Sequence, residues 1–280
     1  MRKWMALSLT LVLVLLTGCS SGGGSRSDAA VHILDQGEAL VAQEALVPVG
    51  NAEKVGYQLE PPQKGEEIAL VTMADGSSFK LRFFPDEAPK AVYNFKKHAL
   101  DGYFDGLTFH RIIQGFMIQG GDPAGTGTGG EAVWGDSFED EFAANLLNLN
   151  GAVSMANRGA NTNRSQFFIN TTGDSRPNWE NYQAGFEVYK TDPEAFTSQY
   201  GRWINMEKVT QEMMDLYNEV GGNAHLDGAT STTGEGHTVF AQVFEGMDVV
   251  NSLSQVAVGS DGSTPVEPVV IQSVKIVLYE

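Results

Sequence analysis

The chain has 280 residues, 42% of them hydrophobic, which is enough to bury a core in one large domain or two small ones. Its formal net charge of −17, without a run of Lys or Arg, disfavours contact with phosphate backbones, so nucleic acid is excluded as an expected partner. Cys19 is the single cysteine, which excludes an intramolecular disulfide and a multi-cysteine metal cluster.

The N-terminus has the order of a secretion signal. A basic start at residues 2–3 precedes the apolar run Met5–Leu16, which is well short of the roughly 20 residues that span a bilayer. The next residues complete Leu-Thr-Gly-Cys and resemble the lipobox of bacterial lipoproteins. The resemblance implies that residues 1–18 are removed and that Cys19 carries a lipid at the extracytoplasmic face of a bacterial membrane. An uncleaved anchor and an ordinary signal peptide are the alternatives.

Residues 19–65 are expected to form a flexible linker behind the lipidated cysteine. Residues 20–25 contain only Ser and Gly, a composition typical of flexible tethers. Weak strand-like runs surround Val31 and Val47, and Pro61-Pro62 ends them. No separate fold is predicted for this stretch.

Alternating hydrophobic runs then predict a β-rich domain. The turn residues Asp75-Gly76 lie between Ile68–Met73 and Ser78–Phe84, which favours a hairpin. A helix is expected next, with Pro89 in its first turn and Gly102 just past its end. Further strands are predicted at Phe109–Ile113, Phe116–Gln119, Ala152–Ala156, Gln166–Asn170, Thr238–Phe244 and Val269–Leu278. Eight strands with few helices indicate a barrel or a sandwich.

A helical pattern interrupts the strands at about residues 175–224. Apolar residues between Met206 and Val220 step by three and four, and Gly221-Gly222 ends the pattern, which predicts a helix of about four turns. Its apolar stripe either packs on the rest of the domain or forms a surface that binds client proteins.

Three separated blocks carry the functional signal. Residues 109–122 place Arg111 among aromatic and aliphatic residues, residues 154–169 are polar between two apolar ends, and residues 236–240 read Gly-His-Thr-Val-Phe. Together and in this order they resemble the cyclophilin family, over residues 66–280 apart from the insertion. The resemblance implies a closed, eight-stranded antiparallel barrel with a helix at each end. It also implies a peptidyl-prolyl cis/trans isomerase that needs no cofactor and assists folding of proline-containing polypeptides.

The chemistry of this reaction explains why a single basic residue would lie among apolar side chains. Rotation about an amide C–N bond meets a barrier of about 18–20 kcal/mol, because the nitrogen lone pair is delocalised. In the twisted transition state the proline nitrogen regains its lone pair and can accept a hydrogen bond. The resemblance assigns this donor role to Arg111, whose charge is permanent.

The resemblance also assigns substrate contacts around Arg111. It implies an apolar proline pocket, polar support for the arginine, a strip that holds the peptide main chain, and histidines near the pocket. The proline pocket is expected from Phe116, Met117, Phe168 and Leu226, and the support of the arginine from Gln119 and Gln166. The main-chain strip is expected at Ala156 and Asn157, and the histidines near the pocket are His110, His225 and His237. No acid/base role is expected for the histidines, because the reaction transfers no proton.

The sequence departs from the family pattern in two places. His225 stands where many members have Trp, and the eight residues 229–236 follow before His237. Weak cyclosporin binding is therefore expected, with less effect on isomerisation. Ala160 and Arg164 stand where Pro and Gly are usual, which is expected to alter the substrate channel near its gatekeeping loop.

Other kinds of site fit less well. The histidines lack metal-ligand spacing, so no metal site is predicted. The glycine-rich residues 120–130 lack the Gly-Lys-Ser/Thr ending of a phosphate loop, so no nucleotide site is predicted. No Gly-x-Ser-x-Gly elbow is present in residues 66–280, so a hydrolase site is not predicted. The remaining alternative is a binding module that grips clients through the insertion. The presence of Arg111, the residue to which the resemblance assigns catalysis, favours an active enzyme over this binding module.

Overall fold

The computed structural model describes residues 32–35, 40–50, 53–173 and 177–280. The predicted signal peptide, Cys19 and the Ser/Gly tether lie outside the described residues. Within these ranges no helix is long and apolar enough to cross a membrane.

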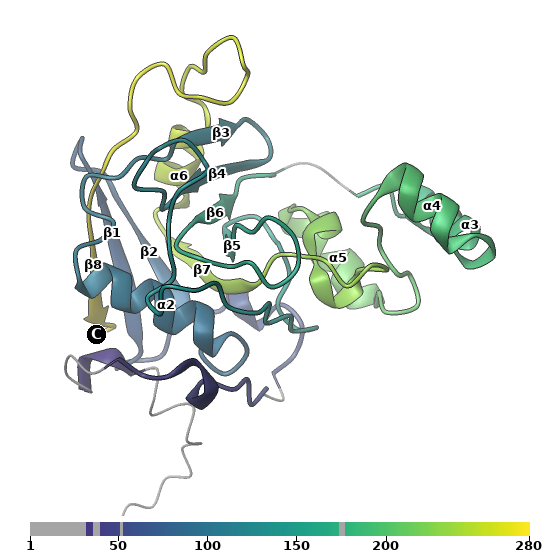
Figure 1. Ribbon diagram of the computed structural model, residues 1–280, viewed down its shortest axis with the longest axis horizontal. Coiled ribbons are helices and arrows are strands. Elements are labelled where there is room, and N and C mark those ends of the chain that lie inside the picture. Colours follow the sequence, from purple (N-terminus) through teal and green to yellow (C-terminus); the bar gives the residue numbers. More distant parts are fainter. Residues whose placement is uncertain (1–31, 36–39, 51–52, 174–176) are drawn as a thin grey trace, which may run out of the picture.

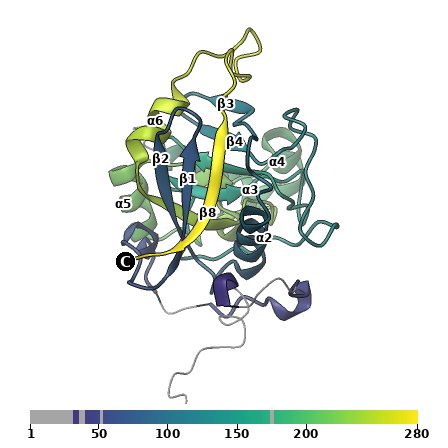
Figure 2. The ribbon, with the colours of Figure 1, turned by 90° about the vertical axis from the view of Figure 1, so that its left-hand side faces the viewer.

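All eight predicted strands are present and form one curled antiparallel sheet (Figures 1 and 2), with neighbours in the order β3-β4-β6-β5-β7-β2-β1-β8. The strands are β1 (Glu67–Met73), β2 (Ser78–Phe83), β3 (Arg111–Ile113), β4 (Met117–Gly120), β5 (Ala152–Met155), β6 (Phe167–Asn170), β7 (Val239–Glu245) and β8 (Ile271–Leu278). The predicted hairpin joins β1 to β2. Gly76 turns the chain with a φ of 86°, and the Asp75 carboxylate accepts from the Ser77 amide at 2.9 Å.

The prediction of a closed barrel needs correction, because β3 and β8 form the two edges of an open sheet. In the described residues no strand ladder joins these edges. The chain just before β3 instead makes one bridge, Thr108 to Val270, and the Phe109 amide donates to the Val269 carbonyl at 2.9 Å. Since β3 is only three residues long, irregular backbone rather than a ladder spans the seam.

Two helices cover opposite ends of the curled sheet (Figure 1), as the family resemblance implied. Helix α2 (Pro89–Leu100) contacts β7 and β8, and α6 (Met247–Ser254) contacts β2 and β4. Proline in the first turn of α2 agrees with the sequence prediction. The position of α6 was not predicted from the sequence.

The interior of the sheet is filled by side chains centred on Phe95 of α2. Its ring centroid lies 4.9 Å from that of Phe104, 5.2 Å from Phe167 and 5.4 Å from Phe240. All four rings are buried, and the contacts include edge-on geometries that aromatic pairs prefer. The sheet therefore encloses a packed core, and a ligand site must lie on its outer face.

From residue 177 on, where the structure describes it, the insertion contains three α-helices, of which α3 (Trp179–Thr191) and α4 (Pro193–Tyr200) project from the body (Figure 1). The predicted four-turn helix is shorter than expected. It is α5 (Gln211–Val220), because the Thr210 hydroxyl accepts from the Met213 amide at 3.2 Å and caps the helix there. Met213 and Tyr217 of α5 are buried against Leu147 and Leu149. The apolar stripe therefore packs on its own domain.

The described residues 32–35, 40–50 and 53–65 differ from the expected flexible linker, because they form an arm that packs on the domain. Short 3-10 helices lie at η1 (Ile33–Asp35), η2 (Gln43–Ala45) and η3 (Tyr57–Leu59). Ile33 and Leu46 are buried in the main core, and the Val41 amide donates to the Tyr93 hydroxyl at 2.8 Å. These few apolar anchors do not stand out in the average composition of the segment.

A buried ion pair fixes the start of the arm. The Lys96 ammonium lies 2.9 Å from the Glu67 carboxylate, and each side chain is only 3% exposed. Glu67 also accepts from the backbone amides of Ile33 and Leu34 at 3.2 and 2.9 Å. Burial alone would raise the pKa of Glu67, but Lys96 and the two amides outweigh it and lower the pKa below its ordinary value.

We expect Glu67→Ala to lower the free energy of unfolding by about 3–5 kcal/mol, because it leaves the Lys96 charge buried without its partner. Since the pKa of Glu67 is lowered by folding, its contribution is present above the ordinary value of 4.5 and is lost as the pH falls. Urea unfolding at several pH values measures both effects. The matched control is Glu245→Ala, which breaks the exposed pair with Lys80 and should cost at most about 1 kcal/mol.

Candidate active site

Strand register places the predicted arginine on the outer face of the sheet. Arg111 is directly opposite Gln119 in the β3–β4 pair, and Gln119 is directly opposite Phe168 in the β4–β6 pair. Residues directly opposite each other project to the same face. Ile112 and Ile118, which alternate with them, are fully buried in the core. Two neighbouring strand pairs therefore bring a cation, an amide and an aromatic ring together.

A chain of hydrogen bonds holds the Arg111 guanidinium. Its Nη1 donates to Gln119 Oε1 at 3.0 Å, Gln119 Nε2 donates to Gln166 Oε1 at 2.8 Å, and Gln166 Nε2 donates to the Gly129 carbonyl at 2.8 Å. In the described part of the chain Arg111 forms no salt bridge. Its charge is therefore oriented by neutral groups and is not cancelled by a carboxylate.

An apolar cup lies beside this guanidinium, and Arg111 Nη1 is 3.8 Å from Met117 Sδ at its wall. The cup consists of three buried side chains and three partly buried ones. They are Met117, Phe168 and Leu226, with Ile113, Phe116 and Ala156 around them. All four residues that were predicted to form the proline pocket belong to this cup, which also includes Ile113 and Ala156.

Leu226 and His237 meet at the cup although ten residues separate them in the sequence. The His237 amide donates to the Leu226 carbonyl at 3.0 Å. Glycine makes the close approach feasible, because a Cβ on Gly236 would lie 2.2 Å from the Cα of Gly228. The extra loop at residues 229–236 thus leaves both Leu226 and His237 at the site.

The two histidines at the cup make different contacts. His225 is exposed and stacks on Phe116, with centroids 6.0 Å apart and an angle of 18°. His237 meets the edge of Phe168 at 5.1 Å, and its Nδ1 donates to the Met155 carbonyl at 2.9 Å. Burial lowers the pKa of His237 to about 4, so the ring is neutral at neutral pH.

A second hollow continues from the glutamines. It has a volume of about 170 Å³. It is lined by both glutamines, by the expected peptide-binding residues Ala156 and Asn157, and by residues 127–129. Arg158, Thr162 and Arg164 also line it and were not predicted as site residues. Asn157 Nδ2 donates to the Gly236 carbonyl at 2.7 Å and so joins this hollow to the cup.

Among the predicted contact residues, His110 lines neither the cup nor the neighbouring hollow and makes no ring contact with the cup. It is buried just before β3, where a Cβ on Gly127 would lie 3.6 Å from its Nε2. Burial lowers the pKa of His110, and the Asp122 charge opposes this effect. The glycine-rich loop beside it is organised by Asp122, whose carboxylate accepts from the amides of Ala124, Thr126 and Gly129.

A buried network behind Leu226 was also missed by sequence reasoning. Asp227 Oδ1 accepts from the Asn148 amide and Nδ2 at 2.8 and 2.9 Å, and Asp227 Oδ2 accepts from the Tyr217 hydroxyl at 2.6 Å. Burial raises the pKa of Asp227 to about 6, although these three donors oppose the rise. The position of Asp227 beside an expected pocket residue was the only signal in the sequence. Through Tyr217, the insertion supports the wall of the cup.

An outward-facing arginine, held by glutamines beside an apolar cup on a curled antiparallel sheet, defines the class of protein. The family model described as cyclophilin type peptidyl-prolyl cis-trans isomerase/CLD matches residues 68–276. The chain belongs to this family and is a cyclophilin-type peptidyl-prolyl cis-trans isomerase.

Individual relatives agree with this membership. Proteins of Staphylococcus epidermidis and Staphylococcus aureus that carry the name "Putative peptidyl-prolyl cis-trans isomerase" are 40% identical over 221 residues, which is 78% of this chain and 96% of theirs. A crystal structure of a cyclophilin-type isomerase from Cryptosporidium parvum has a TM-score of 0.53 at 24% identity, over 76% of this chain and 99% of that chain. This second likeness supports the fold.

We expect Tyr217→Phe to lower the free energy of unfolding by about 1–3 kcal/mol, because the buried Asp227 carboxylate loses a donor. The Tyr217 bond favours the ionised carboxylate, so the loss should be largest above pH 6 and smaller below it. The KM should rise more than kcat falls, since Leu226 is displaced at the cup. Tyr200→Phe, at an exposed tyrosine of the same insertion, is the control. Equal losses in both variants would contradict the support role.

Proposed function

We propose that this enzyme accelerates isomerisation of Xaa-Pro bonds in extracytoplasmic polypeptides and so assists their folding, with Arg111 stabilising the twisted amide. The observation that carries the mechanism is the 3.0 Å bond from Arg111 Nη1 to Gln119 Oε1 at the edge of the apolar cup. This bond leaves other guanidinium N–H groups for a substrate, because a guanidinium has five donors in a rigid plane.

The apolar cup accounts for selectivity towards proline. Met117, Phe168 and Leu226 offer buried hydrocarbon and no hydrogen-bond partner, which suits a ring that lacks an N–H. The same low polarity strengthens a hydrogen bond from Arg111 to the proline nitrogen as the amide twists. Because the planar amide nitrogen is a poor acceptor, the arginine binds the transition state better than the ground state.

Substrate main chain is proposed to lie along Ala156 and Asn157, between the apolar cup and the neighbouring hollow. A second crystal structure of the Cryptosporidium parvum isomerase was determined in the presence of the dipeptide Ala-Pro, with a TM-score of 0.52. That fold supports a proline-containing peptide as the ligand proposed for this chain. Weak cyclosporin binding belongs to the same proposal, because His225 offers less apolar area than Trp.

We expect Arg111→Ala to lower the rate of isomerisation by about 10²-fold while substrate affinity changes much less, because one preorganised donor is lost. Arg111→Lys should recover only part of the rate, since an ammonium lacks the planar fork. The measurement is exchange spectroscopy on both isomers of a short Xaa-Pro peptide, with circular dichroism to verify folding. Lys275→Ala on the exposed face of β8 is the control.

The results distinguish this mechanism from the binding-module alternative. A folded Arg111→Ala enzyme with near-native rates would refute the arginine role. A native protein that suppresses aggregation but does not accelerate isomerisation would favour a module that only binds its clients.

The proposed location rests on the N-terminal sequence. A short apolar run followed by Leu-Thr-Gly-Cys supports removal of residues 1–18 and lipidation of Cys19 at the outer face of a membrane. Removal of residues 1–18 makes the mature chain still more acidic, which disfavours electrostatic attachment to anionic lipid. Attachment therefore depends on acyl chains.

We expect Cys19→Ser to move the protein from the membrane fraction into the soluble or unprocessed pool, because no other cysteine can accept the lipid. Fractionation of cells that express the native and altered chains measures this. Ser20→Ala, which leaves the thiol in place, should stay in the membrane fraction. Retention of a processed Cys19→Ser chain on the membrane would contradict lipid anchoring.

A further inference from the structure

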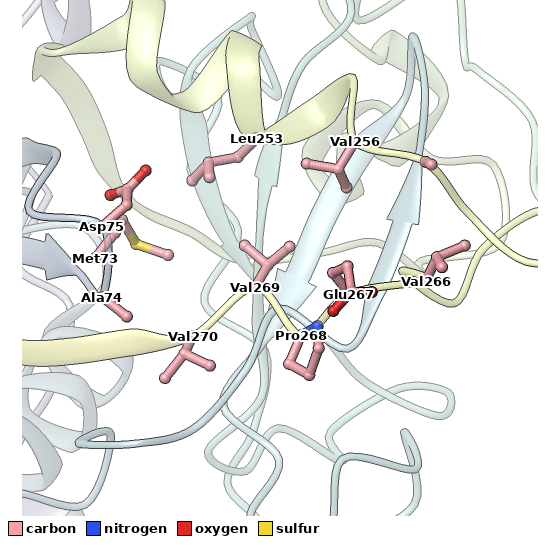
Figure 3. A pocket seen from close by; sticks show the side chains of 11 residues that line it. Met73, Ala74, Asp75, Leu253, Val256, Val266, Glu267, Pro268, Val269 and Val270 are labelled. Atoms are coloured by element: carbon pink, nitrogen blue, oxygen red, sulfur yellow. The ribbon is translucent and has the colours of Figure 1, made fainter.

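A larger cavity lies apart from the apolar cup, between the β1–β2 turn, the end of α6 and the chain that enters β8 (Figure 3). Its volume is about 680 Å³, within the range of sites that bind small ligands or side chains. None of its lining residues belongs to the cup or to the neighbouring hollow. Most of the lining is aliphatic and includes Leu253, Val256, Ala257, Val266 and Val269.

The charge on this lining has one sign. Asp75 and Glu267 are its only charged residues, and Figure 3 shows them on either side of Val269. Both acidic residues are exposed at the surface. Hydrogen bonds from the Ser77 side chain and amide lower the pKa of Asp75, which keeps its carboxylate ionised. The cavity thus combines an apolar wall with an anionic rim.

One wall of the cavity is connected to the strand that carries Arg111. Residues 257–266 form a hairpin loop in which the Val266 amide donates to the Ala257 carbonyl at 2.9 Å. In the same loop the Ser263 carbonyl accepts from the Ile112 amide at 2.7 Å, on the residue next to Arg111. A ligand that moves this loop therefore acts directly on a hydrogen bond of β3.

We infer that this cavity is a second anchoring site for polypeptide, which takes an aliphatic side chain of a segment that also carries Lys or Arg. The aliphatic wall accepts the apolar side chain, and the carboxylates of Asp75 and Glu267 complement the cation. The net charge of −17 disfavours an anionic lipid headgroup or a nucleic acid at this rim. The inference rests on the enzyme's action on polypeptides, because that activity brings such segments to its surface.

The test uses the full chain and a proline-free hexapeptide of alternating leucine and lysine, so that binding does not depend on the proline cup. Fluorescence anisotropy of the labelled peptide gives the Kd, and amide NMR shifts locate the contact. We expect shifts at Val266, Val269 and, through the loop, Ile112. A matched peptide with glutamate in place of lysine should not bind.

Two variants address the two halves of the site. Asp75→Asn combined with Glu267→Gln removes both charges and keeps the side-chain shapes, and should weaken binding of the lysine peptide about tenfold. Ala257→Trp fills the cavity from an exposed position and should abolish binding. The control, Glu212→Gln with Glu219→Gln on α5, removes the same net charge elsewhere and should change the Kd less than twofold.

The outcomes separate this site from general electrostatic attraction and from the proline cup. Equal weakening in the charge variant and its control would overturn the inference, because attraction would then depend on net charge alone. Amide shifts confined to Phe168 and Leu226 would overturn it as well. Arg111→Ala should lose isomerase activity but bind the lysine peptide as the native protein does, which would support a binding site separate from the cup. A failure of the second site is therefore distinguishable from a failure of the arginine mechanism.

Discussion

The cross-strand register of β3, β4 and β6 is the constraint on which the site depends. It directs Arg111, Gln119 and Phe168 outward and leaves Ile112, Ile118 and Ile169 in the core. A slip of one residue would exchange the two sets and bury the guanidinium. The need to bury the isoleucines therefore also fixes the face on which Arg111 lies. Short strands suffice because the packed rings around Phe95 hold the sheet from inside.

The insertion contributes to the same site from behind. Tyr217 and Asn148 hold the buried Asp227, and Asp227 directly follows Leu226 at the wall of the cup. A buried carboxylate without a cation is expensive unless its hydrogen bonds are complete. Helix α5 is for this reason part of the support of the pocket, while α3 and α4 project beyond it (Figure 1).

The strands and the β1–β2 hairpin could be predicted because alternation and turn residues are local signals. The cup and the Arg111–Gln119 pair were predictable because three sequence blocks resemble one family. The start of α5 was wrong by several residues, since the Thr210 cap competes with an apolar stripe that continues upstream. The prediction of a closed barrel was wrong, because pairing between the edge strands β3 and β8 joins segments far apart in the sequence, which local periodicity does not relate.

The docked arm also sets the reach of the enzyme. A fully extended chain spans at most about 3.5 Å per residue, so a free linker from Cys19 to β1 would allow about 170 Å. Because Ile33 is held at Glu67, the chain from Cys19 to the folded body can span at most about 50 Å. For a chain tethered at Cys19, the docked arm would thus remove more than two thirds of the distance that a free linker allows between the surface and β1.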